Sequence, residues 1–114
     1  MQQAPSRGHL VWIDFRPEAG HEPAGRRAAL VISPTAYNQR TGLAIMCPVT
    51  SRLKGYPFEV PLPSGLGVTG VVLADQVRNL DWRARAATSA GVAPASVVSE
   101  VLAKLATLVG EGPD

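Results

Sequence analysis

Three groups of polar residues stand where apolar runs of the sequence begin or end, and their side chains suggest phosphate chemistry. They are Glu22, Arg26 and Arg27 before one run, Thr50, Ser51 and Lys54 after the next, and Asp75 and Gln76 after a third. Arginine presents a planar fork of N–H donors that suits phosphate oxygens. Strands that deliver polar groups through short loops are a common way to build a site. The alternative is that these are solvated turn residues, because Ser, Thr and Asp favour turns for reasons unconnected with function.

The residue patterns of the common metal and cofactor sites are missing from the sequence. His9, His21 and Cys47 are the candidate soft ligands, and their spacing fits no zinc site. Cys47 stands inside an apolar run, which indicates a buried thiol rather than a nucleophile. Residues 65–70 (GLGVTG) resemble a dinucleotide loop but precede a predicted strand instead of joining a strand to a helix. No Ser-His-Asp elbow is present either. We therefore expect neither a metal nor a cofactor.

Short segments rich in β-branched and aromatic residues are the elements that would position the polar groups. They predict strands over residues 9–15, 27–33, 43–49, 56–62 and 68–74, with a continuation past a bend at 75–80 and a further strand at 81–88. Pro48 is expected at an edge or bulge, because proline cannot donate to a ladder. The long loop at 16–26 has a length that is often functional.

The long helical pattern comes last in the chain. Apolar residues recur on one face between Val97 and Val109, with Pro94 at the first helical position and Gly110 as the stop. A short helix is also expected over residues 35–40. Short strands followed by a terminal helix predict a mainly β fold, a small and strongly bent sheet or barrel with the helix packed against it. We expect one domain over residues 1–114, with loose termini at 1–8 and 111–114.

Composition restricts the class of protein further. Of the 114 residues 46% are hydrophobic and 18% charged, which favours a packed core over disorder. A single Cys excludes an internal disulfide, and the lack of a signal peptide points to the cytoplasm. No apolar run approaches the roughly 20 residues that span a bilayer, so no membrane contact is expected. Ten of the eleven basic residues lie within residues 1–90, a balance that permits a polyanionic partner.

Four segments, taken together, resemble a known family. They are residues 10–15 (LVWIDF), 21–34 (HEPAGRRAALVISP), 47–60 (CPVTSRLKGYPFEV) and 73–85 (LADQVRNLDWRAR), followed by the final helix. In this order they are similar to the MazF/PemK/Kid toxins of bacterial toxin–antitoxin systems. The similarity runs without large gaps over roughly residues 8–110.

This resemblance implies the toxin of a type II system, a sequence-specific and metal-independent endoribonuclease that cuts single-stranded mRNA and so inhibits translation and growth. It implies attack by the 2′-hydroxyl, which leaves 2′,3′-cyclic phosphate and 5′-hydroxyl ends. The implied fold is an SH3-like small β-barrel with a C-terminal helix, and the implied assembly is a homodimer. A MazE-like antitoxin would thread an acidic tail through the RNA site, and DNA contact would come only through the antitoxin complex.

Two residues match the family's catalytic pair. Arg27 matches the catalytic arginine, and a guanidinium suits a dianionic phosphorane. Because a guanidinium stays protonated, arginine is a poor general base. We therefore assign electrostatic stabilisation to Arg27, with proton donation as a second role. Thr50 matches the active-site threonine, whose hydroxyl can donate to a nonbridging phosphate oxygen, and Ser51 could donate a second bond.

The acidic residues have less definite roles. Glu22 is the nearest acid in sequence that could serve as a base or orient Arg27. Asp75 matches an acid to which a base role is given in the Kid branch of the family. The arginine that this branch has two residues earlier is Leu73 here, which favours the branch built on Arg27 and Thr50.

Further residues have two interpretations each. Arg26 stands where another family member has histidine, and we expect it to contact phosphate rather than to transfer a proton. Lys54 would contact backbone phosphate or be solvated. Gln76 and Phe15 would read or stack unpaired bases, or else serve strand pairing and core packing respectively.

The two tryptophans are assigned to structure rather than to RNA binding. Trp12 and Trp82 are expected in the core or at the dimer interface. The strand carrying Trp82 and the apolar face of the final helix should contribute to self-association.

Two functions of other classes are kept beside the nuclease. CcdB-type toxins share the barrel and poison a DNA topoisomerase through protein–protein binding, for which neither Arg27 nor Thr50 is needed. The presence of both residues in matching contexts favours the nuclease. A degenerate RNA-binding module that does not cleave is the third possibility.

Overall fold

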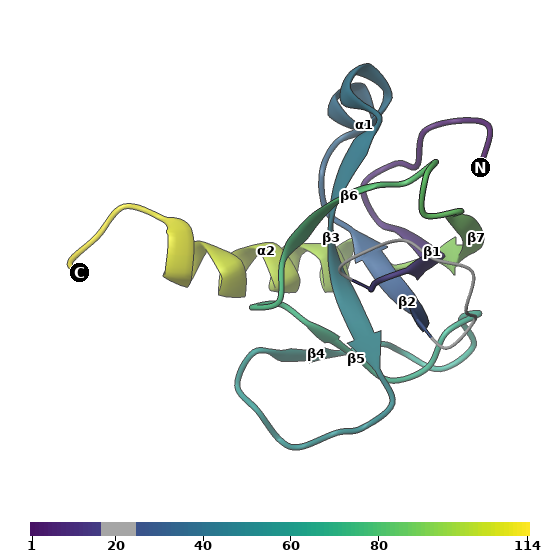
Figure 1. The fold of residues 1–114 in the computed structure, drawn as a ribbon. Coiled ribbons are helices and arrows are strands. Elements are labelled where there is room, and N and C mark those ends of the chain that lie inside the picture. The colour runs from purple at the N-terminus through teal and green to yellow at the C-terminus, as the bar shows by residue number, and fades with distance from the viewer. Residues whose placement is uncertain (17–24) are drawn as a thin grey trace.

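The computed structural model describes residues 1–16 and 25–114, so Glu22 and His21 lie outside the described residues. Within them the chain forms seven strands and two helices (Figure 1). They are β1 (His9–Asp14), β2 (Arg26–Val31), α1 (Thr35–Thr41), β3 (Leu43–Thr50), β4 (Glu59–Pro61), β5 (Val71–Leu73), β6 (Arg78–Asp81), β7 (Thr88–Val92) and α2 (Ala95–Val109). The prediction of a mainly β fold with a C-terminal helix is confirmed.

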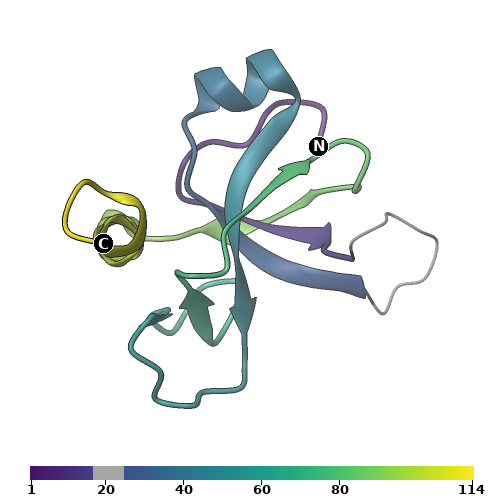
Figure 2. The same ribbon diagram turned by 60° about the vertical axis from the view of Figure 1, so that its left-hand side comes forward.

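The sheet bends around β3. This strand pairs antiparallel with β2 along one edge, and its other edge is shared between β6 and β5. The order of the sheet is β4-β5-β3-β2-β1-β7, with β6 beside β3. The two partners on the shared edge diverge from each other along β3, as Figure 2 shows. This divergence gives the sheet its strong curvature and leaves the end of β3 beside β5.

Pro48 lies at the break between these two pairings. Met46 is the last residue of β3 that is paired with β6, and Val49 is the first that is paired with β5. A residue without an N–H group fits where no ladder bond is required. Pro48 was expected at a sheet edge or a bulge. It lies instead inside a central strand, at the point where the pairing partner of β3 changes.

The two faces of the curved sheet bury separate apolar clusters. One cluster lies against α2 and includes Leu10, Leu30 and Val101, while the other includes Val11 and Trp82. Leu10 and Val11 are neighbours in β1 and point to opposite faces, and both are fully buried. Burial on both faces explains why the central strands read as continuous apolar runs.

α2 packs against the core as far as Leu105, and its last turn extends beyond the core. Val101 is fully buried, whereas Leu108 is 54% and Val109 is 73% exposed. The helix runs on away from the sheet toward the C-terminus (Figure 1). It begins at Ala95, one residue later than predicted, because Pro94 has an extended backbone with ψ 151°. In the described part of the chain, neither helix has the length and apolar content needed to cross a bilayer.

The first eight residues are ordered against the sheet, so the prediction of a loose N-terminus is wrong. Pro5 is buried, and its carbonyl accepts a hydrogen bond of 2.8 Å from Nδ2 of the buried Asn38. The α-ammonium group of Met1 donates to the carbonyl of Ala87 at 2.7 Å. These contacts with distant segments fix a stretch whose composition alone suggested a free end.

The segment 81–88, predicted as one strand, contains the turn of residues 82–87 that joins β6 to β7. Oδ1 of Asp81 accepts hydrogen bonds of 3.0 and 2.8 Å from the N–H groups two and three residues later. Ala86 adopts a left-handed conformation with φ 54°. An aspartate that caps the following N–H groups begins a turn, even where side chains alternate as in a strand. Trp82 is 1% exposed inside the protomer, so it is a core residue and not part of an interface.

β4 and β5 are shorter than predicted. The carbonyl of Tyr56 accepts a hydrogen bond of 3.0 Å from the N–H of Glu59, and the resulting turn delays the start of β4. β5 begins after Gly70, which has φ 123° and where a Cβ would lie 2.2 Å from the carbonyl oxygen of Thr50. Glycine at this position therefore lets the chain before β5 approach the end of β3 closely.

Candidate active site

Arg27 and Thr50 come together where the β2–β3 ladder ends. The antiparallel register sets Ala29 opposite Pro48 as the last pair of this ladder, and continuing the two strands by two residues leads to Arg27 and Thr50. Side chains at directly opposed positions lie on the same face of a sheet and within reach of each other. The two residues also line two surface depressions jointly. Two segments far apart in the sequence thus deliver the predicted pair to one place.

One of these hollows, which we call the central depression, has a volume of about 410 Å³. It lies between the end of β3, the end of β5 and the loop of residues 51–58 that joins β3 to β4. Its lining includes Arg27, Arg52, Lys54, Thr50, Tyr56 and Asp75. Three cations, the two carboxylates of Asp75 and Glu59 and a hydroxyl surround the hollow, and the excess of positive charge suits a ligand that carries phosphate.

Two further depressions adjoin the central one. A hollow of about 400 Å³ is lined by Trp12 and Ser51 among others, and a smaller one of about 230 Å³ by Arg16 and Arg78. Arg27 lines all three hollows. Arg27 therefore stands where the three hollows meet, with further cations in the central depression and in the smallest hollow.

The hydroxyl of Thr50 has one contact that defines its orientation. Its Oγ1 accepts a hydrogen bond of 3.2 Å from the backbone N–H of Arg52. Because the oxygen acts as acceptor here, its own proton remains able to donate to another group. The same bond bends the chain at the start of the 51–58 loop and turns Arg52 toward the central depression.

Asp75 is joined to the opposite side of the central depression through Tyr56. The phenolic O–H of Tyr56 donates to Oδ2 of Asp75 at 2.9 Å. This hydrogen bond, reinforced by the negative charge of the carboxylate, raises the pKa of Tyr56. The phenol is thereby kept protonated and able to donate. The other carboxylate oxygen, Oδ1, is buried and has no hydrogen-bond partner among the described residues.

Cys47 lies beneath this carboxylate and behaves as the sequence predicted. Its side chain is fully buried in the cluster under α2. Burial, with a smaller contribution from the charge of Asp75, raises the pKa of Cys47 to about 12. The side chain is therefore a neutral thiol at physiological pH and not a nucleophile.

The 51–58 loop is attached to the rest of the molecule at several points. The carboxylate of Glu59 accepts the N–H groups of Lys54 and Gly55 at 3.1 and 3.2 Å. From α2, Nζ of Lys104 donates to the carbonyl of Pro57. Together with the bond between Tyr56 and Asp75, these contacts hold the loop as a wall of the central depression.

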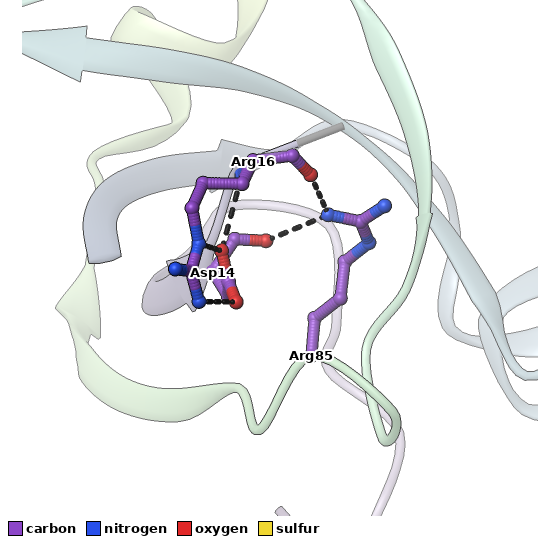
Figure 3. Close-up of polar contacts among 3 residues, drawn as sticks. All are labelled: Asp14, Arg16 and Arg85. Atoms are coloured by element: carbon purple, nitrogen blue, oxygen red, sulfur yellow. Dashed lines mark hydrogen bonds and ion pairs between the residues drawn. The ribbon is translucent and has the colours of Figure 1, made fainter. Parts of the chain in front are cut away.

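A cluster of charged residues fixes the end of β1 at the far rim. The Asp14 carboxylate accepts hydrogen bonds of 3.0 and 2.8 Å from the Arg16 guanidinium, with an ion pair at the second contact. Arg85, from the β6–β7 turn, donates to the backbone carbonyls of both Asp14 and Arg16 (Figure 3). The cluster therefore holds Arg16 beside the smallest of the three depressions.

A family model described as PemK-like, MazF-like toxin of type II toxin–antitoxin system matches residues 6–109. The chain belongs to this family. Among its relatives, the endoribonuclease toxin MazF of Escherichia coli (strain K12) is 47% identical over 106 residues, covering 93% of this chain and 95% of the relative. The endoribonuclease toxin ChpB of the same strain is 43% identical, with 90% and 92% covered.

Solved structures of MazF proteins have the same fold as this MazF-like toxin. MazF from Deinococcus radiodurans is 62% identical and superposes with a TM-score of 0.86, covering 95% of this chain and 98% of that one. A MazE–MazF structure from the same organism is 57% identical with a TM-score of 0.84, covering 96% and 98%. The small β fold with a C-terminal helix that the resemblance implied is thereby confirmed.

Most of the residues predicted to assist RNA binding in this MazF-like toxin surround Arg27. Lys54, Asp75 and Gln76 line the central depression, and Ser51 lines its neighbour. The remaining acid of that set, Glu22, falls outside the described residues. Strand ends thus bring together residues that the sequence separates by up to 49 positions, from Arg27 to Gln76.

Two residues of the predicted set have mainly structural contacts: Arg26 is engaged elsewhere, whereas Phe15 lines the smallest depression together with Arg27. Arg26 donates to a backbone carbonyl of the β6–β7 turn at 2.8 Å and to the hydroxyl of Thr88 at 2.9 Å. Neighbours in a strand point to opposite faces, so Arg26 points away from the face that carries Arg27. Phe15 is 7% exposed and the guanidinium of Arg78 covers its ring at 5.3 Å, which favours the core-packing interpretation.

Some residues of the central depression were not singled out from the sequence. Arg52 and Tyr56 both line it, and with Lys54 they form an alternation of cations and an aromatic ring that is typical of single-strand binding surfaces. Interpreting the segment from Tyr56 onward as a strand concealed this signal. Trp12, expected in the core or at an interface, is 39% exposed and lines the neighbouring hollow of this MazF-like toxin.

Proposed function

We propose that this MazF-like toxin is a sequence-specific, metal-independent endoribonuclease that cleaves single-stranded mRNA and thereby inhibits translation and growth. The observation that carries the proposal is that Arg27 and Thr50 line the same two depressions. Endoribonuclease relatives at 47% and 43% identity support it. The single strand follows the hollows around Arg27, with Arg52 and Lys54 near its phosphates.

The cleavage step exchanges one bond at phosphorus for another. The 2′-oxygen forms a bond to phosphorus while the bond from phosphorus to the 5′-oxygen breaks. The 2′-hydroxyl gives its proton to solvent, and the departing 5′-oxygen receives one from the Arg27 guanidinium, which solvent reprotonates, so that the products are a 2′,3′-cyclic phosphate and a 5′-hydroxyl. No water is consumed in this step, and the protein contributes by position and charge.

The two central residues have complementary roles in this step. The Arg27 guanidinium stabilises the two negative charges of the pentavalent phosphorane, and an N–H of the same group is positioned to protonate the leaving 5′-oxygen. The hydroxyl of Thr50 donates a hydrogen bond to a nonbridging phosphate oxygen, since its own oxygen already accepts a hydrogen bond from the N–H of Arg52. Ser51, exposed in the adjoining hollow, donates a second bond.

The partners follow from the same surface. A MazE–MazF structure from Deinococcus radiodurans supports a cognate MazE-like antitoxin for this chain. Its acidic tail competes with RNA for the cations around Arg27, and DNA is contacted only through the antitoxin complex. The toxin acts as a homodimer in the cytoplasm. The exposed apolar end of α2, including Leu108 and Val109, supports self-association, whereas the buried Trp82 does not contribute.

Cleavage in the presence of a chelator tests the proposal. Purified protein is incubated with a long single-stranded RNA in EDTA, and the ends of the products are identified chemically. We expect discrete fragments that carry 2′,3′-cyclic phosphate and 5′-hydroxyl ends. Intact RNA together with inhibition of a DNA topoisomerase would favour the poison, and RNA that is bound but intact would favour the non-cleaving module.

A further inference from the structure

Tyr56 is an exposed aromatic residue whose position is nevertheless fixed. Its side chain is 46% exposed. The phenolic O–H is bonded to Asp75 at 2.9 Å, and the ring rests against Phe58 with centroids 5.7 Å apart at an angle of 46°. A hydrogen bond at the tip and a ring contact at the side leave little rotational freedom. An apolar ring held in solvent in this way is prepared for a contact that the isolated chain lacks.

The surroundings of the ring indicate the class of ligand. Tyr56 lines the central depression together with Arg52, Lys54 and Gln76. An aromatic ring beside cations is the arrangement by which proteins hold unpaired nucleobases, since the ring stacks on the base and the cations follow the phosphates. The amide of Gln76 offers both a donor and an acceptor to the edge of a base.

The geometry points to Tyr56 as the stacking platform for one unpaired nucleobase of the RNA next to the scissile phosphate, with Asp75 as the positioning residue that holds the ring. This inference rests on the proposed function, because Arg27 and Thr50 of the same depression define where the scissile phosphate lies. Asp75 accordingly acts through Tyr56 and is not the base of the reaction.

Trp12 is the alternative stacking residue, and the structure favours Tyr56. Trp12 is 39% exposed but lines the adjoining hollow, whereas Tyr56 shares its hollow with Arg52 and Lys54. A nucleobase is also favoured over an aromatic side chain of an antitoxin. An acidic tail could also neutralise the two cations, but an aromatic side chain lacks the edge of donors and acceptors that a base offers to the amide of Gln76.

An abasic scan combined with substitution measures the stacking directly. The cleavage site of the wild-type protein is mapped first, and a short RNA is made uncleavable by a 2′-deoxy nucleotide at that site. A series of such RNAs, each lacking one base, is then titrated by fluorescence anisotropy. We expect wild type to lose about 5-fold to 150-fold in affinity at one position next to the cut. In Tyr56→Ala the penalty at that position should disappear while the penalties elsewhere persist.

Leu53→Ala is the matched control, because it shortens a large side chain that is 66% exposed on the same loop. It should keep the wild-type profile. Tyr56→Phe retains the ring but loses the bond to Asp75, so it should keep part of the abasic penalty. Asp75→Ala should reduce the same penalty and Asp75→Asn, whose amide oxygen can still accept the phenol, should restore it. A merely electrostatic role for Asp75 would change affinity for every RNA of the series equally.

The inference is overturned if Tyr56→Ala shows the abasic profile of wild type and of Leu53→Ala. It is equally overturned if Tyr56→Ala weakens binding of an acidic antitoxin peptide and leaves the RNA profile intact. In both cases a wild-type protein that still cuts RNA leaves the proposed function standing. A wild-type protein that cuts no RNA removes the proposed function, and this inference fails with it.

Discussion

The hydroxyl of Thr50 is a single donor on which much of the proposed chemistry depends. Removing one preorganised donor from an oxyanion site costs about 10²–10³ in rate. We therefore expect Thr50→Ala to lower the single-turnover cleavage rate by about that factor, with RNA affinity little changed. Thr50→Ser keeps the hydroxyl and is the control, which should retain most of the rate. An unchanged rate in Thr50→Ala would place the phosphate elsewhere.

The raised pKa of Cys47 predicts that the free energy of unfolding depends on pH. Its pKa is about 12 in the folded chain, above the value of 9.0 for a free thiol. Above pH 9 the unfolded chain loses this proton while the folded chain keeps it, so the free energy of unfolding falls between pH 9 and about 12. The largest slope for one proton is about 1.4 kcal/mol per pH unit.

The measurement is chemical denaturation of wild type and Cys47→Ala over that range of pH. The variant loses stability at all pH values through its smaller side chain, so the slope is what is compared. We expect a shallower decline in Cys47→Ala than in wild type. Parallel declines would mean that the thiol does not titrate differently in the two states.

The positions of β3 and β5 at the site depend on the close approach of Gly70 to Thr50. At Gly70 a Cβ would lie 2.2 Å from the carbonyl oxygen of Thr50, and φ is 123°. We expect Gly70→Ala to lower the free energy of unfolding and, by displacing Thr50, to reduce cleavage as well. Gly65→Ala is the control, because Gly65 has φ 91° but nothing within 4 Å of the added atom.

Thermal denaturation and cleavage assays of both variants distinguish the effect of the steric clash at Gly70 from the effect of a strained backbone conformation. Gly65→Ala should cost only the left-handed conformation, about 1–2 kcal/mol, and keep its activity. Equal stability and equal activity of the two variants would show that the approach of β5 to β3 is not required.

The elements also show what the sequence could predict and what it could not. Continuous apolar runs located the central strands and the 3.6-residue period located α2, because burial of these residues produces both patterns. The 81–88 segment was misinterpreted because the side-chain bonds of Asp81 form a turn that alternation cannot reveal. The resemblance supplied Arg27 and Thr50. Tyr56 escaped notice because its role depends on Asp75, which lies 19 residues away in sequence.

At the scale of the whole molecule, the cations around Arg27 predict the salt dependence of RNA binding. Each phosphate neutralised on a single strand contributes a slope of about −0.7 to the plot of log K against log salt concentration. Arg52 and Lys54 line the central depression with Arg27. We therefore expect Arg52→Gln and Lys54→Gln each to reduce the slope by about 0.7.

The slope is measured by anisotropy with an uncleavable RNA over a range of salt concentrations. Arg40→Gln removes an exposed cation from the last turn of α1 and should leave the slope unchanged. A flat salt dependence in the wild-type protein would contradict an electrostatic groove at this surface.

The role of Arg27 is tested most directly by the single-turnover cleavage rate of Arg27→Ala, measured beside wild type and Arg40→Ala. The RNA carries the mapped site, and circular dichroism confirms that the variants are folded. We predict that Arg27→Ala loses cleavage by several orders of magnitude while its melting temperature stays near that of wild type, and that Arg40→Ala cleaves normally. A folded Arg27→Ala protein that cleaves at the wild-type rate would contradict the assignment of this guanidinium to the scissile phosphate.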